Sequence, residues 1–206
     1  MTTLIINIKS FLFLYLAYSL HNVIFDIEAF QNILFFTKDF NPTVGSLLYL
    51  PIGAALLSYL LYGKKAILGI FAAIILSGIY NELKNYILVG YTIVGVLGPL
   101  LAIYLIEKFR LANFKDFPNT SIRHLLFLCI FAGLINTVGK FIVYFSYPFS
   151  DAAISWFNGG PTQFLLTFLP GDIVGGSLFL LTSLAVIKFF HLDKTNANSS
   201  SNNPLN

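Results

Sequence analysis

RHLLFLCIFAGLINTVGKFIVYFS, residues 123–146, decides the fold class of this chain. A helix of about 20 mainly apolar residues is long enough to cross a bilayer, and beyond its first residue this stretch contains one charged side chain, Lys140. The other stretches of this length and character are 8–26, 44–62, 65–82, 86–107 and 164–189. The sequence therefore predicts an all-α integral membrane protein, a bundle of about six transmembrane helices.

The composition of the whole chain supports a membrane protein. Of its 206 residues, 57% are hydrophobic and 10% are charged, and the mean hydropathy is +0.80. A soluble domain contains about 45–50% apolar and about 25% charged residues, so lipid must solvate much of this surface. We expect one transmembrane domain over residues 1–192 and a disordered, Asn- and Ser-rich cytoplasmic tail over 193–206. Residues 28–42 are too polar for a span and favour a short helix in the membrane interface.

The distribution of basic residues predicts the orientation of the chain. Basic residues in short loops mark the cytoplasmic side of a membrane protein. With the N-terminus inside, nine of the twelve basic residues are cytoplasmic: Lys9, Lys64, Lys65, Lys108, Arg110, Lys115, Arg123, Lys188 and Lys194. We therefore predict a bacterial inner (plasma) membrane protein with both termini in the cytoplasm.

Several functional classes find no support in the sequence. The three histidines fall on opposite sides of the predicted membrane and form no metal-binding triad. No catalytic triad and no phosphate-binding loop is present, and no basic run suits a nucleic acid. The single cysteine, Cys129, excludes a disulfide framework. We therefore expect no enzyme, no metal and no cofactor.

Lys140 is the one basic residue in the interior of a predicted span. In one interpretation, its long side chain extends to the outer interface, where a lysine costs little free energy. In the other, it faces the interior of the bundle, because Cys129, Gly133, Asn136 and Lys140 recur at helical spacing and form one small, polar face.

Asp172 is the second charge that requires an explanation. It can be an N-terminal residue of the sixth span, where a helix favours an acid. Alternatively, it pairs with Lys140, directly or through a ligand, because the fifth and sixth spans are neighbours in sequence and place the two residues at a similar depth. The pairing is a hypothesis that depends on matched depth and opposite charge.

Further unusual residues lie on the predicted outer half of the membrane. Pro51 and Gly53 interrupt the second span and predict a kink, Glu82 ends the third span, and Trp156, the only tryptophan, lies in the loop before the sixth. We predict an outward-facing ligand pocket with Lys140, Asn136 and Asp172 as its polar groups. Pro51 and Gly53 would shape its wall, and Glu82 and Trp156 would also contribute to ligand binding.

The order of these motifs resembles the first type of membrane-associated sensor (MASE) domain of bacterial histidine kinases and cyclic-di-GMP enzymes. The resemblance covers most of residues 44–190 and rests on three motifs. They are Tyr49-Leu50-Pro51-Ile52-Gly53 with the basic turn Tyr62-Gly63-Lys64-Lys65, the charged loop from Arg110 to Arg123, and Gly171-Asp172-Ile173-Val174-Gly175. It implies a sensory or ligand-binding role. No kinase, cyclase or phosphodiesterase sequence follows the last predicted span, so the resemblance implies signalling through a partner protein.

Two other classes of protein fit the predicted layout. Substrate-binding subunits of energy-coupling-factor vitamin transporters are also six-helix proteins of about this length, but they usually carry an Ala-x-x-x-Ala seam in the first span. Here Phe11, Leu14, Ala17 and Tyr18 stand in that span without such a seam. The third class is a structural or assembly partner that binds no small molecule.

Overall fold

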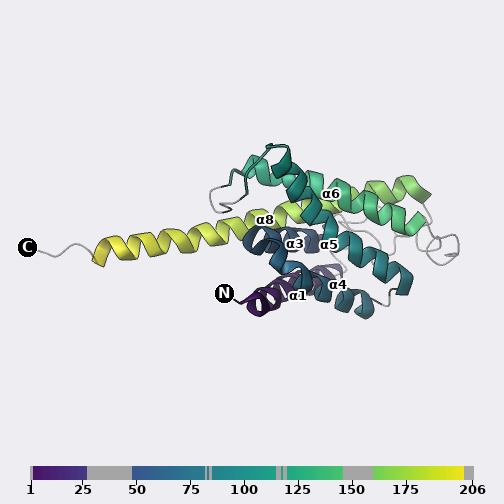
Figure 1. Ribbon diagram of the computed structural model, residues 1–206, viewed down its shortest axis with the longest axis horizontal. Coiled ribbons are helices and arrows are strands. Elements are labelled where there is room, and N and C mark those ends of the chain that lie inside the picture. Colours follow the sequence, from purple (N-terminus) through teal and green to yellow (C-terminus); the bar gives the residue numbers. More distant parts are fainter. Residues whose placement is uncertain are drawn as a thin grey trace, which may run out of the picture.

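The structure is a computed structural model that describes residues 2–26, 48–81, 83, 85–114, 117, 120–145 and 160–201. Within these residues every regular element is helical. The elements are α1 (Thr3–Asp26), α3 (Leu50–Tyr62), the short 3-10 helix η1 (Gly63–Ala66), α4 (Ile67–Tyr80), α5 (Asn85–Lys108), α6 (Ile122–Phe145) and α8 (Gly160–Ser201). Figure 1 shows them packed side by side as one bundle, from which the C-terminal part of α8 projects. The predicted interfacial helix at 28–42 lies outside the described residues.

Five helical stretches of the described chain are long and apolar enough to cross a membrane: Thr3–Ile24, Leu50–Tyr80, Ile87–Lys108, Ile122–Phe145 and Phe164–Phe189. The predicted all-helical membrane bundle is therefore confirmed. The second stretch contains both α3 and α4, which the sequence predicts as two separate full-length spans. With 13 and 14 residues, each is about 20 Å long and shorter than a hydrocarbon core of about 30 Å.

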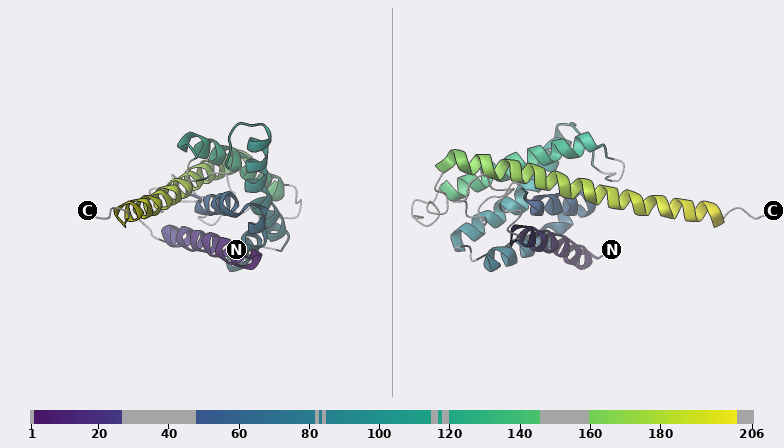
Figure 2. Two further views of the ribbon diagram at one scale, coloured as in Figure 1. Left: turned by 60° about the vertical axis from the view of Figure 1, so that its left-hand side comes forward. Right: turned by 180° about the vertical axis from the view of Figure 1, so that it is seen from behind.

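The contacts of α1 show that the chain reverses direction between α3 and α4. We call this reversal the α3–α4 hairpin, although the two helices pack on α1 rather than closely on each other. The start of α3 lies beside the C-terminal half of α1, where Tyr18 and Tyr49 share a hydrogen bond. The start of α4 lies beside the N-terminal half of α1, where the Asn7 side chain accepts a hydrogen bond from the Gly69 N–H. The chain therefore reverses direction between them, at Gly63, whose φ of +58° favours glycine. Figures 1 and 2 show both helices beside α1.

The structure corrects the prediction of a kink at Pro51. Helix α3 begins at Leu50, with Tyr49 as its N-cap, so Pro51 lies in its first turn. A proline in that position removes an N–H that has no partner within the helix, and it causes no kink. The predicted span began at residue 44, but residues 44–47 are not described and Leu48 and Tyr49 are not helical.

Glycines bring the helices into direct backbone contact. A Cβ atom on Gly53 of α3 would lie 2.8 Å from the carbonyl oxygen of Gly176 in α8, and one on Gly175 would collide with the backbone of Tyr49. Between α4 and α1, a Cβ atom on Gly69 would collide with the backbone of Asn7. These glycines therefore permit helix packing that any larger residue prevents.

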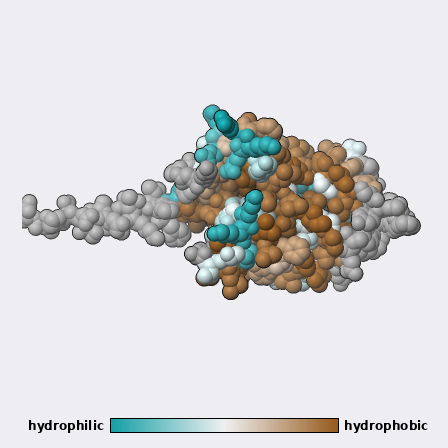
Figure 3. Space-filling model, viewed as in Figure 1, coloured by the Kyte–Doolittle hydropathy of each residue, from teal (hydrophilic) through white to brown (hydrophobic). Residues whose placement is uncertain are grey.

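The outer surface of the bundle is apolar. Large hydrophobic side chains are exposed on α1, α4, α5, α6 and α8, including Leu4, Leu68, Val89 and Leu166. Figure 3 shows a hydrophobic surface whose hydrophilic residues gather toward the side from which α8 projects. An apolar exterior with polar groups at one end is the arrangement expected when lipid surrounds the helices.

Helix α8 is longer than the span predicted from the sequence. It runs from Gly160 to Ser201 and so includes residues 193–201 of the tail that we predicted to be disordered, whereas residues 202–206 lie outside the described part. Figure 2 shows this helix leaving the bundle and extending well beyond the other elements. Residues in its buried part are therefore connected to its projecting part by continuous helix.

Candidate functional site

Lys140 of α6 and Asp172 of α8 form a buried ion pair. Their side chains are 1% and 0% exposed, and the Lys140 Nζ atom lies 3.9 Å from the Asp172 Oδ1 atom. The pairing hypothesis is therefore confirmed, and so is the placement of Lys140 inside the bundle. The alternative in which Lys140 extends to the interface is wrong because its side chain has almost no exposed surface.

The position of Asp172 rules out its interpretation as an N-terminal helix residue. Helix α8 begins at Gly160, so Asp172 lies more than three turns into the helix. The Asn136 Nδ2 atom donates to its Oδ2 atom at 2.8 Å, and the Thr137 hydroxyl donates to the same atom at 3.1 Å. Both donors come from α6, so Asp172 links α8 to α6 by two hydrogen bonds and one ion pair.

The small, polar face predicted on the fifth span lies in the interior of the bundle. Cys129, Gly133, Asn136 and Lys140 of α6 are all buried. Gly133 packs against α8, because a Cβ atom on it would lie 3.0 Å from the Ile173 side chain and 3.4 Å from that of Asp172. This face therefore brings α6 close enough to α8 for Lys140 and Asn136 to meet Asp172.

Three aromatic rings surround the Lys140 ammonium group. The Nζ atom lies 4.2 Å from the centroid of the Tyr49 ring, 4.6 Å from that of Tyr91 and 5.2 Å from that of Phe168. We call these three rings the aromatic cage. The rings come from the residue before α3, from α5 and from α8, so the cage exists only in the assembled bundle. Each ring face attracts a cation, most strongly where water is excluded.

The ion pair leaves hydrogen-bonding capacity unused. Among the described residues, neither Lys140 Nζ nor Asp172 Oδ1 has a hydrogen-bond partner, although both atoms are buried. An ammonium group has three donors, so Coulomb attraction and the aromatic cage are the stabilising contacts of this one. Burying such a pair is costly, and apolar residues of similar size often give an equal or higher stability. Stability alone is therefore a poor explanation for this pair.

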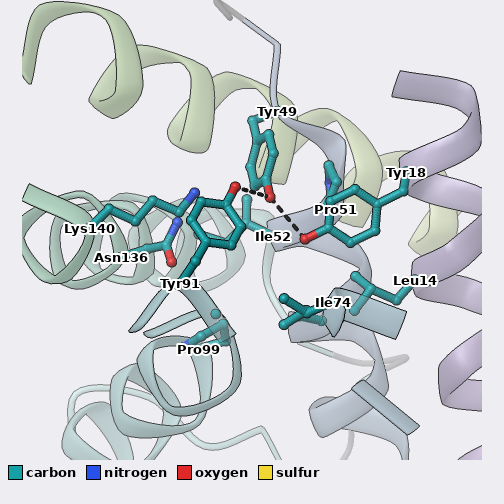
Figure 4. A pocket seen from close by; sticks show the side chains of 12 residues that line it. Leu14, Tyr18, Tyr49, Pro51, Ile52, Ile74, Tyr91, Pro99, Asn136 and Lys140 are labelled. Carbon is teal, nitrogen blue, oxygen red and sulfur yellow. Dashed lines mark hydrogen bonds between the residues drawn. The ribbon is translucent and has the colours of Figure 1, made fainter. Parts of the chain in front are cut away.

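A chain of tyrosine hydroxyls lies beside the pair. The Tyr49 hydroxyl is 3.0 Å from that of Tyr18 and 2.8 Å from that of Tyr91. Figure 4 shows these three hydroxyls in a row joined by the two hydrogen bonds, with Lys140 drawn at the Tyr91 end of the row. The His21 Nδ1 atom lies 3.0 Å from the Leu48 carbonyl oxygen, and its ring packs edge-on against Tyr49. The hydroxyl chain thus connects α1, the start of α3 and α5.

The same residues line a small cavity. Its lining includes Tyr18, Tyr49, Pro51, Tyr91, Asn136 and Lys140. The volume is about 10 Å³, close to the least that accommodates one water molecule. The bundle is therefore closed around Lys140, and a larger molecule requires these side chains to move apart.

Of the seven predicted site residues, four lie at the ion pair or its cavity, one packs elsewhere, and two lie outside the described residues. Lys140, Asn136 and Asp172 are in contact, and Pro51 contributes to the cavity wall as predicted. Gly53 is not part of the cavity lining and packs on Gly176 instead. Glu82 and Trp156 lie outside the described residues. For all seven residues, the role in ligand binding stays a prediction.

Sequence reasoning did not identify the aromatic cage or Thr137 as parts of the site. Tyr49, Tyr91 and Phe168 are aromatic residues in an apolar chain with 22 Phe and 11 Tyr, so their type alone does not distinguish them. Thr137 follows Asn136 directly in the sequence, and its position next to that predicted site residue was the only indication that it belongs to the site.

Fold and site together define the class of protein: a multi-pass helical membrane protein with a caged lysine–aspartate pair inside its bundle. In comparisons with known proteins, no family model matches the chain, and no similar curated protein or solved structure is found.

Proposed function

We propose that this chain is a sensory membrane protein of the bacterial plasma membrane, which binds a small molecule at Lys140 and Asp172 and signals through a partner protein. Both termini are cytoplasmic in this proposal. The observation that carries it is the buried ion pair with no hydrogen bond between its two charges. Ionisable residues inside a membrane bundle are costly and usually mark a functional site.

The unsatisfied atoms make the ion pair sensitive to a ligand. A molecule that supplies an acceptor to Lys140 Nζ and a donor to Asp172 Oδ1 satisfies both atoms. Such a ligand binds an opened bundle better than the closed one, in which the cavity holds about 10 Å³. Differential affinity for two conformations is what shifts their populations.

The position of Asp172 on α8 supports a sensory role. Phe168 and Asp172 both lie on this helix, which continues to Ser201 beyond the bundle (Figure 2). A ligand that separates Asp172 from α6 displaces α8, and a continuous helix transmits a displacement along its length. The resemblance of the motifs to MASE sensor domains agrees with this direction of signalling.

Native mass spectrometry of the full chain, extracted in mild detergent, tests the proposal. We expect a small molecule to be retained by the wild type and by Lys64→Met, which changes an exposed lysine in the turn after α3. The double variant Lys140→Met/Asp172→Asn should lose it while eluting as the same folded species. Equal retention by the double variant, or no retained molecule in the wild type, refutes a ligand site at this pair.

Co-purification distinguishes a sensor from a transporter subunit. A sensor should carry a signalling protein such as a kinase or cyclase, and the double variant should change signalling output. A co-purified ATPase together with nutrient uptake that depends on this chain would instead favour the vitamin-transporter class.

A further inference from the structure

The aromatic cage identifies the chemical group that the site recognises. Three ring faces lie within 5.2 Å of the Lys140 Nζ atom, and a carboxylate oxygen lies at 3.9 Å. Rings and a carboxylate around one position are the features that proteins use to bind alkylammonium ligands. In this bundle the ammonium group of Lys140 occupies that position. A ligand that takes its place must carry a similar cation.

Charge balance restricts the rest of the ligand. The closed site holds one positive and one negative group, Lys140 and Asp172. A simple cation would leave two positive charges with one carboxylate, and a simple anion would leave two negative charges with one ammonium. Either excess is costly in a buried site. A molecule with one charge of each sign keeps the site neutral.

The surroundings provide a place for the negative group. When the flexible Lys140 side chain leaves the cage, its ammonium remains available to pair with an anion. The three hydroxyls of Tyr18, Tyr49 and Tyr91 are joined by two hydrogen bonds. Each hydroxyl donates one hydrogen, so one O–H remains to donate to an anionic oxygen. Figure 4 shows these hydroxyls and the Lys140 amine around the same cavity.

We propose that the ligand is a small ammonium carboxylate, such as an α-amino acid or an N-methylated betaine. Its ammonium group occupies the aromatic cage next to Asp172, and its carboxylate pairs with the displaced Lys140 and the tyrosine hydroxyls. The small cavity, of about 10 Å³ in the closed bundle, favours a compact molecule. This inference rests on the proposed ligand-binding function and names its substrate class.

Thermal unfolding of the purified full-length protein in detergent tests the substrate class. The probes are the standard amino acids and glycine betaine, each compared with the amine that lacks its carboxylate and the acid that lacks its ammonium group. We expect at least one zwitterion to raise the unfolding temperature in a saturable manner, and its matched amine and acid to have little effect. Equal stabilisation by the amine or the acid, or stabilisation by no zwitterion, overturns the proposal.

Two phenylalanine variants test whether the cage makes the contact. Phe168→Leu removes one cage ring and should weaken binding of the zwitterion about tenfold. Phe145→Leu removes a ring that is 41% exposed and should leave the affinity unchanged. If both variants bind equally well, the ammonium does not occupy the cage.

The two proposals fail in different ways. If native mass spectrometry shows a retained molecule that depends on Lys140 and Asp172 but is not a zwitterion, the ligand site stands and this assignment of its class is wrong. If a zwitterion stabilises the wild type and the double variant Lys140→Met/Asp172→Asn equally, it binds elsewhere and this assignment is wrong. If native mass spectrometry also shows no retained molecule that depends on Lys140 and Asp172, both proposals fail.

Discussion

The backbone N–H of Tyr49 donates a hydrogen bond of 2.9 Å to the carbonyl oxygen of Gly171. The ring that covers the Lys140 ammonium is thereby attached to the helix that carries Asp172. Gly175, one turn further along α8, has no room for a side chain because the Tyr49 backbone lies against it. The two motifs around Pro51 and Asp172, far apart in sequence, therefore form one structural unit.

Replacement of Gly175 by alanine should damage this unit. The new Cβ atom collides with the Tyr49 backbone, and overpacking of this kind costs about 1–3 kcal/mol. We expect a lower unfolding temperature in detergent for Gly175→Ala. The matched control is Gly98→Ala in α5, where the nearest atom would lie 3.7 Å away. If both variants unfold like the wild type, the close contact between Tyr49 and α8 is wrong.

Removal of one member of the ion pair should cost more than removal of both. Lys140→Met leaves Asp172 buried without its cation, a change that costs about 3–5 kcal/mol in proteins. We expect Lys140→Met/Asp172→Asn to recover much of this loss, since no isolated charge remains. A double-mutant cycle on unfolding temperatures measures the coupling, with Lys64→Met as the control. Additive effects of the two substitutions would contradict the pairing.

Tyr49 contributes a ring and a hydroxyl, and two substitutions separate them. Tyr49→Phe keeps the ring over Lys140 but removes both hydrogen bonds, to Tyr18 and Tyr91. At about 0.5–1.5 kcal/mol for each bond, we expect a loss of about 1–3 kcal/mol. Tyr49→Leu also removes the cation–π contact and should be less stable still by urea or thermal unfolding. An equal loss in both variants would show that the ring contributes nothing.

The reversal of the chain between α3 and α4 predicts that the turn between them and the far end of α4 lie on opposite faces of the bundle. Lys64 lies in the turn and Tyr80 at the end of α4, and both are exposed. The native Cys129 is buried, so the folded wild type should react little with a maleimide. With the proposed orientation, in which Lys64 is cytoplasmic, we expect a membrane-impermeant maleimide to label Tyr80→Cys in intact cells, and to label Lys64→Cys only after permeabilisation. Labelling of both from the same side would refute the hairpin.

Periodicity made part of the site predictable from the sequence. Asn136 and Lys140 are four residues apart in one apolar helix, so the sequence placed them on one face with Cys129 and Gly133. The charge of Asp172 suggested its partner, because an isolated charge in a membrane bundle is costly. The role of Pro51 was not predictable. A proline kinks the interior of a helix and fits its first turn, so its effect depends on where the helix begins.

The sequence by itself determined that this chain is an all-helical membrane protein with a polar face on residues 123–146. Hydrophobicity and helical period are local properties of the sequence. A chain with 57% hydrophobic residues has more apolar surface than a soluble fold can bury, so the membrane is the environment it fits. Only the tertiary structure decided that Tyr49, Tyr91 and Phe168 meet around Lys140. These rings come from three separate segments, and their convergence depends on how closely α3 and α8 approach at Gly53, Gly175 and Gly176. Distances between helices depend on packing of all their side chains together, which no local pattern encodes.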